Sequence, residues 1–297
     1  MKKILLTGIN GQVGHALLAK LERYELLALS RNELDLSNAD QIRQVVRDFK
    51  PDVIINPAAY TAVDKAESEA ELAYAINATA PKILAEEAAR LGASLIHFST
   101  DYVYDGSKLS AYDETDLVNP VSIYGKTKLA GEEAIRDVGL PHLILRTSWV
   151  YGAYGKNFLK TILRLASERE KISIVADQIG APTSSACIAD AVDKLIDCWN
   201  TDQIDHTGVY HLTNSSNTSW HGFSTEIINQ YQQIALIQDW PALKVAEIAA
   251  ITTYDYPTPA ARPANSVLNN KKLFDTFGIK LPTWQLGLSQ VMQQIKL

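Results

Sequence analysis

The sequence predicts an α/β protein, with a doubly wound parallel sheet and a smaller C-terminal lobe. In the first half of the chain, short apolar runs alternate with longer segments of helical character. The apolar runs are almost uninterrupted, which is typical of parallel strands covered by helices on both faces. This alternation stops after residue 150. We therefore expect residues 1–150 to form the sheet domain, and residues 151–297 to form mainly the smaller lobe, with some segments returning to the sheet domain.

The strands are predicted to end near one another, because parallel strands in such a sheet present their carboxyl ends at one edge. The predicted strands cover residues 4–6, 25–30, 52–57, 94–100 and 142–148. The predicted helices cover residues 15–21, 38–49, 67–91 and 124–138, the third being rich in the helix formers Ala, Glu and Leu. Gly8, Ala58, Thr100 and Trp149 each end or follow a predicted strand, so we expect them to share one cleft.

The second half offers fewer regular patterns. Residues 177–183 have the composition of a loop, and residues 253–263 contain too many prolines for regular structure. We expect these segments to belong to a lobe that closes over the carboxyl edge of the sheet.

Three glycines lie between the first predicted strand and the first predicted helix. They are Gly8, Gly11 and Gly14, with Asn10, Gln12 and Val13 between them. In a Rossmann-type fold the first glycine permits a tight turn, the second lets the backbone approach a pyrophosphate, and the third lets the helix pack closely on the strand. The helix N-terminus also offers N–H groups to the phosphates. We therefore predict that residues 1–150 bind NAD(P).

The end of the second strand bears on the choice of dinucleotide. An acidic residue at this point binds the ribose 2′-OH of NAD, whereas an arginine suits the 2′-phosphate of NADP. The residues here are Ser30 and Arg31, which favour NADPH while leaving NADH possible. Asp35 follows a few residues later, and we expect it beside the adenine.

Tyr124 and Lys128 are the candidate catalytic pair. Residues four apart share one face of a helix, so we expect the Lys128 ammonium to lie near the Tyr124 phenol. A nearby positive charge lowers the pKa of a phenol from its usual value of about 10. A phenol tuned in this way can donate a proton to a carbonyl oxygen while hydride reaches the carbon. Thr100 is expected in the same cleft.

Length and composition limit the possible classes of protein. A chain of 297 residues, of which 46% are apolar, fits one large or two small globular domains. We expect no membrane span and no leader segment, and the net charge of −6 argues against nucleic-acid binding. Cys187 and Cys198 lack metal or redox spacing, which is typical of reduced thiols in a cytoplasmic protein. His97 is interpreted as a buried core residue, and His15 and His221 have no partners at metal-binding spacing.

These residues resemble those of the extended short-chain dehydrogenase/reductase superfamily and, within it, the dTDP-4-dehydrorhamnose reductase family. The glycine turn and the Tyr124/Lys128 pair are common to the superfamily. The narrower resemblance rests on longer blocks that run nearly from end to end of the chain. The blocks are GQVG at 11–14, AVDKAE at 62–67, STDYVY at 99–104, YGKTKLAGE at 124–132, RTSWVY at 146–151, DQIGAPT at 177–183 and PTPAARP at 257–263.

The resemblance implies an NADPH-dependent reduction of the C4 ketone of dTDP-4-dehydro-6-deoxy-L-mannose, with a sugar-nucleotide-binding C-terminal lobe. It implies that Tyr124, Lys128 and Thr100 are catalytic, and that Asn77 contacts Lys128 through water. The implied cofactor-binding residues are Gly8, Asn10, Gly11, Gln12, Val13, Gly14, Ser30, Arg31, Asp35, Leu36, Ala58, Ala59, Tyr60, Phe98, Tyr124 and Lys128. The implied substrate-binding residues are Thr100, Asp101, Tyr102 and Trp149, and Arg262 is added as a candidate because its planar guanidinium suits a pyrophosphate.

The chain departs from the resemblance at two positions. Some members of the family bind Mg²⁺ at a dimer interface through glutamates, and the corresponding residues here are Ala16 and Ala186. Alanine offers no oxygen ligand to a hard cation. We therefore expect no metal, and a monomer or a metal-independent homodimer that acts on a small-molecule sugar nucleotide.

Alternatives remain open for three of the substrate-binding residues. Trp149 is either a core aromatic or a platform on which a sugar or base stacks. Asp101 can cap the turn after its strand, contact the substrate, or do both. Arg262 either pairs with a pyrophosphate oxygen or is an exposed loop residue.

Two other functions are compatible with the same fold. One is that of an epimerase or dehydratase, although such dehydratases typically carry Asp-Glu after the active-site Thr. Here Thr100 is followed by Asp101 and Tyr102. The other is that of a non-catalytic regulatory subunit, like the β subunit of methionine adenosyltransferase, which resembles this family. A pure binding subunit has no need of Tyr124, Lys128 and Thr100 together.

Overall fold

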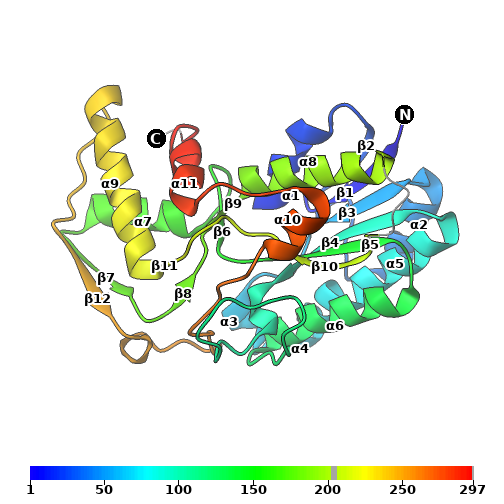
Figure 1. Cartoon of the computed structure of the whole chain (residues 1–297), viewed down its shortest axis with the longest axis horizontal. Coiled ribbons are helices and arrows are strands. Elements are labelled where there is room, and N and C mark those ends of the chain that lie inside the picture. The colour runs from blue at the N-terminus through cyan, green and yellow to red at the C-terminus, as the bar shows by residue number, and fades with distance from the viewer. Residues whose placement is uncertain (202–205, 296–297) are drawn as a thin grey trace.

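A six-stranded parallel sheet forms the centre of the larger part of the molecule (Figure 1). The computed structural model describes residues 1–201 and 206–295. The strands are β1 (Lys3–Thr7), β2 (Glu25–Leu29), β3 (Val53–Asn56), β4 (Ser94–Thr100), β5 (His142–Thr147) and β10 (Gly208–His211). Their order is β10-β5-β4-β3-β1-β2, and every pairing is parallel. The chain therefore changes direction across the sheet between β1 and β3, which is where ligands bind in such folds.

Helices cover both faces of this sheet, so the predicted doubly wound fold is confirmed. One face packs against α1 (Gln12–Leu21) and α8 (Ser185–Thr201). The other face packs against α2 (Ala39–Phe49), α5 (Ala80–Leu91) and α6 (Ile123–Val138). The strands are buried on both sides, which explains their nearly continuous apolar sequences.

The predicted helix over residues 67–91 is helical from residue 70 to residue 91, with a π-helical turn inside it. The segment forms α4 (Ala70–Tyr74), a π-helical turn η1 (Ala75–Thr79) and α5, and a short α3 (Val63–Ala66) precedes them. Within η1, the buried Asn77 side chain accepts from Tyr60 N at 2.8 Å and donates to Thr127 Oγ1 at 3.0 Å. π-Helical turns often occur at functional sites. Contacts from distant segments accompany the irregular turn, and local composition does not reveal them.

The ends and the path of α6 follow from its sequence. Ser122 caps the first turn by accepting from Gly125 N at 3.1 Å, and Gly139 ends the helix with a φ of 75°. A Cβ at Gly125 would lie 2.2 Å from the carbonyl oxygen of Tyr102. Glycine therefore lets α6 lie directly against the 3₁₀ turn η2 (Asp101–Val103) that follows β4.

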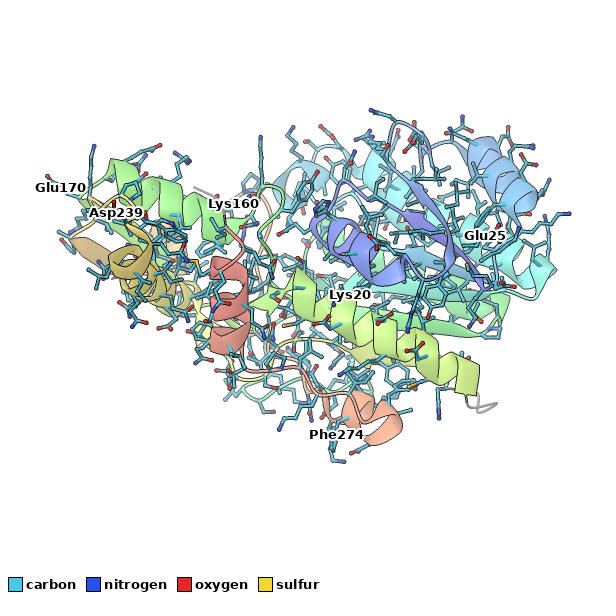
Figure 2. All side chains as sticks on the ribbon, turned by 90° about the horizontal axis from the view of Figure 1, so that it is seen from above. Lys20, Glu25, Lys160, Glu170, Asp239 and Phe274 are labelled. Atoms are coloured by element: carbon cyan, nitrogen blue, oxygen red, sulfur yellow. The ribbon has the colours of Figure 1, made fainter. Side chains whose placement is uncertain are left out.

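A second core lies in the smaller lobe, among side chains that include Tyr151, Phe223 and Trp284. The lobe consists of α7 (Phe158–Glu168), α9 (Trp220–Gln238), α11 (Trp284–Met292) and a parallel pair of strands, β7 (Lys171–Val175) and β12 (Glu247–Ile251). Figure 2 shows the two parts from above, with Lys160 on the smaller lobe and Lys20 on the sheet domain.

Three segments of the second half contribute to the sheet domain. α8 packs beside α1, β10 adds the sixth strand next to β5, and α10 (Lys271–Phe277) packs near β10. Sequence patterns did not predict β10, which has four residues and is flanked by irregular segments.

Short strands connect the two parts. β6 (Val150–Tyr151) pairs with β9 (Thr183–Ser184), and β8 (Ile179–Gly180) pairs with β11 (Thr218–Ser219). The loop predicted over residues 177–183 is thus partly extended, and residues 253–263 contain the 3₁₀ turn η3 (Thr253–Asp255). In the part of the chain that the structure describes, no helix has both the length and the apolar character needed to cross a membrane.

Candidate active site

A cleft of about 920 Å³ lies at the carboxyl edge of the sheet. Gly8, Ala58, Thr100 and Trp149, which the sequence predicts to share one cleft, all line it. Three of the predicted site residues do not line it, namely Ser30, Lys128 and Arg262. The remaining predicted site residues do, from the glycine turn at one end to Tyr124 and Trp149 at the other.

The glycine turn between β1 and α1 has the geometry of a dinucleotide cradle. Gly8 has a φ of 64°, and Gly11 N donates to Gly8 O at 2.9 Å, which closes the turn. A Cβ at Gly14 would lie 2.2 Å from Gly8 O, so α1 approaches β1 only because Gly14 has no side chain. The first turn of α1 points toward the cleft and lacks a side-chain cap at Gly11. These residues fit a pyrophosphate, which would accept from the N–H groups at the start of α1.

One side of the cleft, where the adenosine of a dinucleotide is expected, carries Arg31 and Asp35. Arg31 lines the cleft beside Asp35. Hydrogen bonds from Ser37 hold the pKa of Asp35 below its usual range. Ser30 instead donates from both N and Oγ to Glu33 Oε2 at 2.8 Å. The hydroxyl of Ser30 is thus already paired within its own turn, and Arg31 is the side chain that faces the cleft.

Tyr124 and Thr100 lie together at the other end of the cleft. Burial raises the pKa of Tyr124 to about 12, although a hydrogen bond with the Thr100 side chain acts in the opposite direction. The expected lowering of this pKa by Lys128 is wrong, because Lys128 is not among the groups that act on the phenol. At neutral pH the phenol therefore keeps its proton, which is the form that can act as a general acid.

Asp101 is buried directly beside Thr100. Its Oδ1 accepts from Thr100 Oγ1 at 2.9 Å, and Thr100 Oγ1 accepts from Tyr102 N at 3.2 Å. Thr100 is therefore the residue that caps the turn, which is one of the two roles considered for Asp101. Burial raises the pKa of Asp101 to about 6, against hydrogen bonds from Ser266 and Thr100.

Lys128 lies behind the cleft wall. Its side chain is buried, and Nζ donates to the carbonyl oxygen of Phe98 at 2.6 Å and lies 3.2 Å from His97 Nε2. Burial lowers the pKa of Lys128 to about 8, while the charge of Glu132 acts in the opposite direction. The Asn77 side chain bonds to Tyr60 and Thr127, and its link to Lys128 through water stays a prediction.

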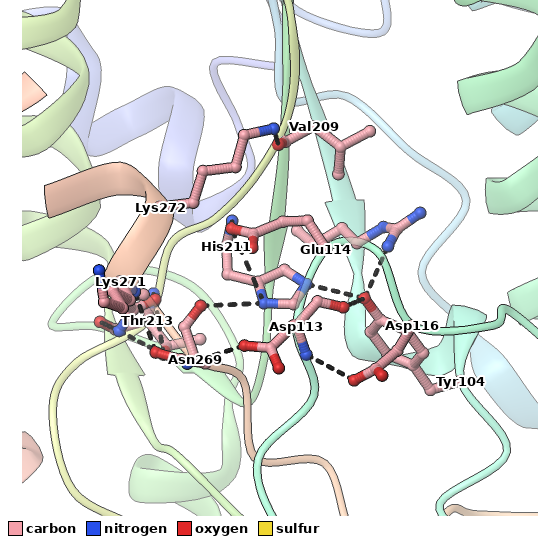
Figure 3. A network of polar contacts seen from close by, with 12 residues as sticks. Tyr104, Asp113, Glu114, Asp116, Val209, His211, Thr213, Asn269, Lys271 and Lys272 are labelled. Carbon is pink, nitrogen blue, oxygen red and sulfur yellow. Dashed lines mark hydrogen bonds and ion pairs between the residues drawn. The ribbon is translucent and has the colours of Figure 1, made fainter. Parts of the chain in front are cut away.

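A buried ion pair fixes α6 to β5 below the cleft. Glu132 accepts from Arg146 at 2.6 Å and 2.9 Å, and both side chains are almost completely buried. Arg146 also donates to Tyr104 Oη at 2.7 Å, and Tyr104 Oη lies 2.8 Å from His211 Nε2. Figure 3 shows how this network continues from His211 to Asn269. The helix α6 is thereby joined to the edge strand β10.

Trp149 has a conformation that is rare for a large side chain. Its φ is 48°, and its ring stacks on Trp220 with 3.5 Å between ring centroids and 7° between planes. A Cβ at Gly180 would lie 2.5 Å from the Trp149 ring, so a glycine is required there. Trp220 Nε1 in turn donates to Gln178 Oε1 at 3.2 Å. The stacked pair lines the cleft, and backbone strain of this kind typically occurs at functional sites.

Arg262 is paired with a carboxylate. Its guanidinium donates to both oxygens of Asp64, at 2.8 Å and 3.1 Å, and also to Ala260 O. This pair joins the proline-rich loop to α3, and the side chain is partly buried. Arg262 is thus not a freely exposed loop residue. Its contact with a pyrophosphate stays a prediction.

Further residues line the cleft that were not predicted as site residues, and two lysines and a tryptophan among them have side chains long enough to contact a ligand. They are Lys65 on α3, Lys156 in the loop before α7, and Trp220 at the start of α9. Each comes from an irregular segment or from a distant part of the chain, so no local spacing distinguishes it. Among the described residues, no three His, Cys, Asp or Glu side chains are grouped in a way that could hold a metal ion.

Comparison with known proteins agrees with this geometry. The family model described as RmlD substrate binding domain matches residues 1–297. The chain is 44% identical to the dTDP-4-dehydrorhamnose reductase of Burkholderia thailandensis over 297 residues, which is 99% of each protein. It is 41% identical to that of Escherichia coli, over 98% of this chain and 97% of the relative.

A solved structure is similar over the whole chain. It is the dTDP-4-dehydrorhamnose reductase of Bacillus anthracis in complex with NADP, with a TM-score of 0.89, 38% identity and coverage of 99% of this chain and 100% of that chain. A UDP-glucose 4-epimerase of Thermus thermophilus in complex with NAD has a TM-score of 0.76 at 17% identity, which shows the shared fold alone.

Proposed function

The chain belongs to the dTDP-4-dehydrorhamnose reductase family, and we propose on this premise that it reduces dTDP-4-dehydro-6-deoxy-L-mannose to dTDP-L-rhamnose with NADPH. This is the last step of dTDP-L-rhamnose synthesis. The observation that carries the proposal is the pairing of Tyr124 with Thr100 in a cleft that also contains a dinucleotide cradle. A proton donor and a cofactor site in one cleft are what reduction of a carbonyl group needs.

Tyr124 supplies the proton in this reaction. NADPH, when bound, supplies the hydride that reaches C4 of the sugar. The Tyr124 phenol donates its proton to the C4 oxygen as charge develops there. Thr100 donates a hydrogen bond to the same oxygen when its hydroxyl turns from Asp101 Oδ1 to the substrate, so both groups stabilise the transition state more than the ground state. The raised pKa of Tyr124 keeps the donor protonated at neutral pH.

Lys128 acts by binding and by charge rather than by tuning the phenol. Its Nζ is already fixed by Phe98 O, so it offers a preset cation at the end of β4. We propose that it holds the nicotinamide ribose. The glycine turn, Asn10, Gln12 and Val13 hold the pyrophosphate, and Arg31 favours the 2′-phosphate of NADPH over the 2′-OH of NADH.

The sugar nucleotide lies across the two lobes in this proposal. Asp101, Tyr102 and Trp149 contact the sugar or its nucleotide, since they line the cleft between the sheet domain and the smaller lobe. Arg262 reaches the pyrophosphate only by sharing its guanidinium with Asp64. In this proposal residues 1–150 bind the cofactor and also carry Asp101, Tyr102 and Trp149, and residues 151–297 add Arg262 to the substrate side.

The observations that disfavour other functions concern the same cleft. A dehydratase needs an acid/base pair after Thr100, and the second residue of that pair is replaced by Tyr102. A regulatory subunit has no need of Tyr124 and Thr100 held together in a cleft with a dinucleotide cradle. We also propose a cytoplasmic location, no nucleic-acid partner, and a monomer or a homodimer that forms without metal.

Turnover tests the proposed function directly. The purified chain should oxidise NADPH when dTDP-4-dehydro-6-deoxy-L-mannose is added, and the product should match dTDP-L-rhamnose by mass and by NMR. UDP-glucose and dTDP-glucose should give no turnover, which separates reduction from epimerase and dehydratase activity. No NADPH oxidation with the keto sugar, together with tight NADPH binding, would instead favour a regulatory subunit.

A further inference from the structure

His97 occupies an unusual position for a core histidine. It lies on β4, is completely buried, and its Nε2 is 3.2 Å from Lys128 Nζ. Its Nδ1 lies 3.1 Å from Asn56 Nδ2 on β3. Asn56 Oδ1 in turn accepts from Thr7 Oγ1 at 2.6 Å on β1. A hydrogen-bonded series of polar side chains therefore crosses three neighbouring strands and ends at Lys128.

The placement of this hydrogen-bonded series follows from the strand register. Asn56 and His97 are directly paired across β3 and β4, and Thr7 lies one residue after the Leu6–Ile55 pair of β1 and β3. Their side chains share the face of Leu5, Ile54 and Leu95, which α5 and α6 cover. Thr7 also lines the cleft beside Gly8, so the end of the hydrogen-bonded series opposite Lys128 reaches the glycine turn.

We propose that His97, held by Asn56 and Thr7, is a positioning residue that fixes the amino group of Lys128 at the carboxyl end of β4. This inference rests on the proposed function, because it concerns the lysine of the same site. Buried polar groups of this kind are costly unless each has a partner, and here each side chain has one.

The hydrogen-bonded series from Thr7 to Lys128 has two self-consistent arrangements of protons. If Lys128 is an ammonium, Nε2 must accept, so Nδ1 carries the proton and donates to the Asn56 amide oxygen, turned toward it. If Lys128 is a neutral amine, Nε2 carries the proton and Nδ1 accepts from the Asn56 NH₂ group. Burial holds the pKa of His97 well below its usual value, so the ring stays neutral and can serve either arrangement. His97 is therefore suited to fix the Lys128 amino group in both of its protonation states.

Other titratable groups near Lys128 are accounted for by different partners. On its own helix they are Tyr124, which bonds to Thr100, and Glu132, which is paired with Arg146 of β5. At the end of β4 there is Asp101, which accepts from Thr100.

The helices around α6 carry further titratable groups. On α5 there is Glu87, which binds Arg47 of α2, and η1 contributes no titratable side chain. On α3 there is Asp64, which binds Arg262, and Lys65, which lines the cleft. In the part of the chain that the structure describes, His97 is thus the titratable side chain that lies within hydrogen-bond distance of Lys128 Nζ.

Two variants of His97 distinguish a role in positioning Lys128 from a role that consists only of filling the core. In His97→Gln the amide group can replace Nε2 and still contact Lys128, whereas in His97→Asn the shorter amide replaces Nδ1 and contacts only Asn56. The two side chains are both neutral amides, so they make a matched pair. His142→Asn, which removes another buried imidazole from the adjacent strand β5, is the control.

We expect His97→Asn to lower kcat by about tenfold or more, since a hydrogen bond to a charged group is lost. KM for the sugar nucleotide should change little. We expect the alkaline fall of kcat to move to lower pH by about one unit, because the ammonium loses an acceptor. His97→Gln should retain most of the wild-type rate and the wild-type pH profile, and His142→Asn should retain both.

NADPH affinity gives a second readout that does not need turnover. It is measured by fluorescence titration of the wild type and the variants, and His97→Asn should bind NADPH several-fold more weakly than His97→Gln. If the wild type binds NADPH but turns over no keto sugar, the proposed function fails, and this titration still decides the role of His97. Equal losses in both variants, in kcat and in NADPH affinity, would overturn the proposal and assign His97 to the core.

Discussion

Lys128 Nζ donates a hydrogen bond to the carbonyl oxygen of Phe98 at 2.6 Å, so this lysine is tied to the backbone of β4. This contact explains why the lysine does not tune Tyr124 in the way that helical spacing suggests. Burial of the amino group lowers the pKa of Lys128 to about 8. Lys128 is thus a cation at neutral pH that loses its charge at mildly alkaline pH, and the expected pH dependence of the rate follows from this.

The rate should fall at alkaline pH. Because the folded-state pKa of Lys128 is lowered to about 8, its ammonium is present below that pH and is lost above it. We expect kcat to decrease by about tenfold per pH unit above pH 8, while binding of the sugar nucleotide changes little. A profile that stays flat to pH 10 would contradict the need for the charge. In Lys128→Met the residual rate should no longer show this alkaline fall.

Tyr124→Phe should remove the proton donor while it keeps the ring. We expect kcat to fall by about 10²–10⁴, the usual scale for one acid or base group. NADPH affinity should stay close to that of the wild type, because the cradle lies at the other end of the cleft. Near-normal turnover in this variant would refute the assignment of Tyr124 as the general acid.

Arg31→Ala should weaken NADPH more than NADH. Arg31 faces the cleft on its adenosine side, and a hydrogen bond to a charged group is worth roughly 1.5–3 kcal/mol. The ratio of the two KM values should therefore move by about tenfold or more. Arg164→Ala, which removes an exposed arginine of α7, should leave the ratio unchanged. An equal effect of Arg31→Ala on both cofactors would place Arg31 outside the 2′-phosphate site.

Glu132→Gln should destabilise the fold strongly. The variant leaves the buried guanidinium of Arg146 without a carboxylate, and breaking a buried pair in this way typically costs about 3–5 kcal/mol. Glu168→Gln breaks the exposed pair with Arg164 and should cost less than about 1 kcal/mol. Urea unfolding of both variants gives the comparison. Similar midpoints for the two variants would show that the buried pair contributes little to stability.

Activity should persist after treatment with EDTA. The family resemblance places Ala16 and Ala186 where some relatives carry metal-binding glutamates, and in the proposed mechanism Tyr124 supplies the proton without a Lewis acid. We expect the rate and the sedimentation coefficient to be the same with and without Mg²⁺. A large loss of rate on chelation that Mg²⁺ restores would show that ligands elsewhere in the chain hold a required metal.

Local patterns in the sequence were sufficient for most of the sheet domain. The glycine turn, the first five strands and α6 follow from apolar runs, glycine spacing and caps such as Ser122, all of which act over a few residues. The cleft at the carboxyl edge follows from the parallel topology. Tyr124 and Thr100 are accordingly found together where they were expected.

Features that depend on distant contacts were not predictable in this way. The π-helical turn accompanies the bonds of Asn77 to Tyr60 and Thr127, and β10 exists because it pairs with β5. Trp220 reaches the cleft from α9 to stack on Trp149. The shifts in pKa of Tyr124 and Lys128 depend on burial in the folded chain, which spacing along one helix does not describe.

Transfer of deuterium from cofactor to sugar tests the central claim most directly. The chain is incubated with NADPH that carries deuterium at the transferable C4 position of the nicotinamide, together with dTDP-4-dehydro-6-deoxy-L-mannose, and the product is analysed by mass spectrometry and NMR. The proposed reaction predicts one deuterium per product molecule, bound to C4 of the sugar, and almost none when Tyr124→Phe replaces the wild type over the same time. Product without deuterium, or deuterium at another carbon, would contradict reduction of the C4 ketone in this cleft.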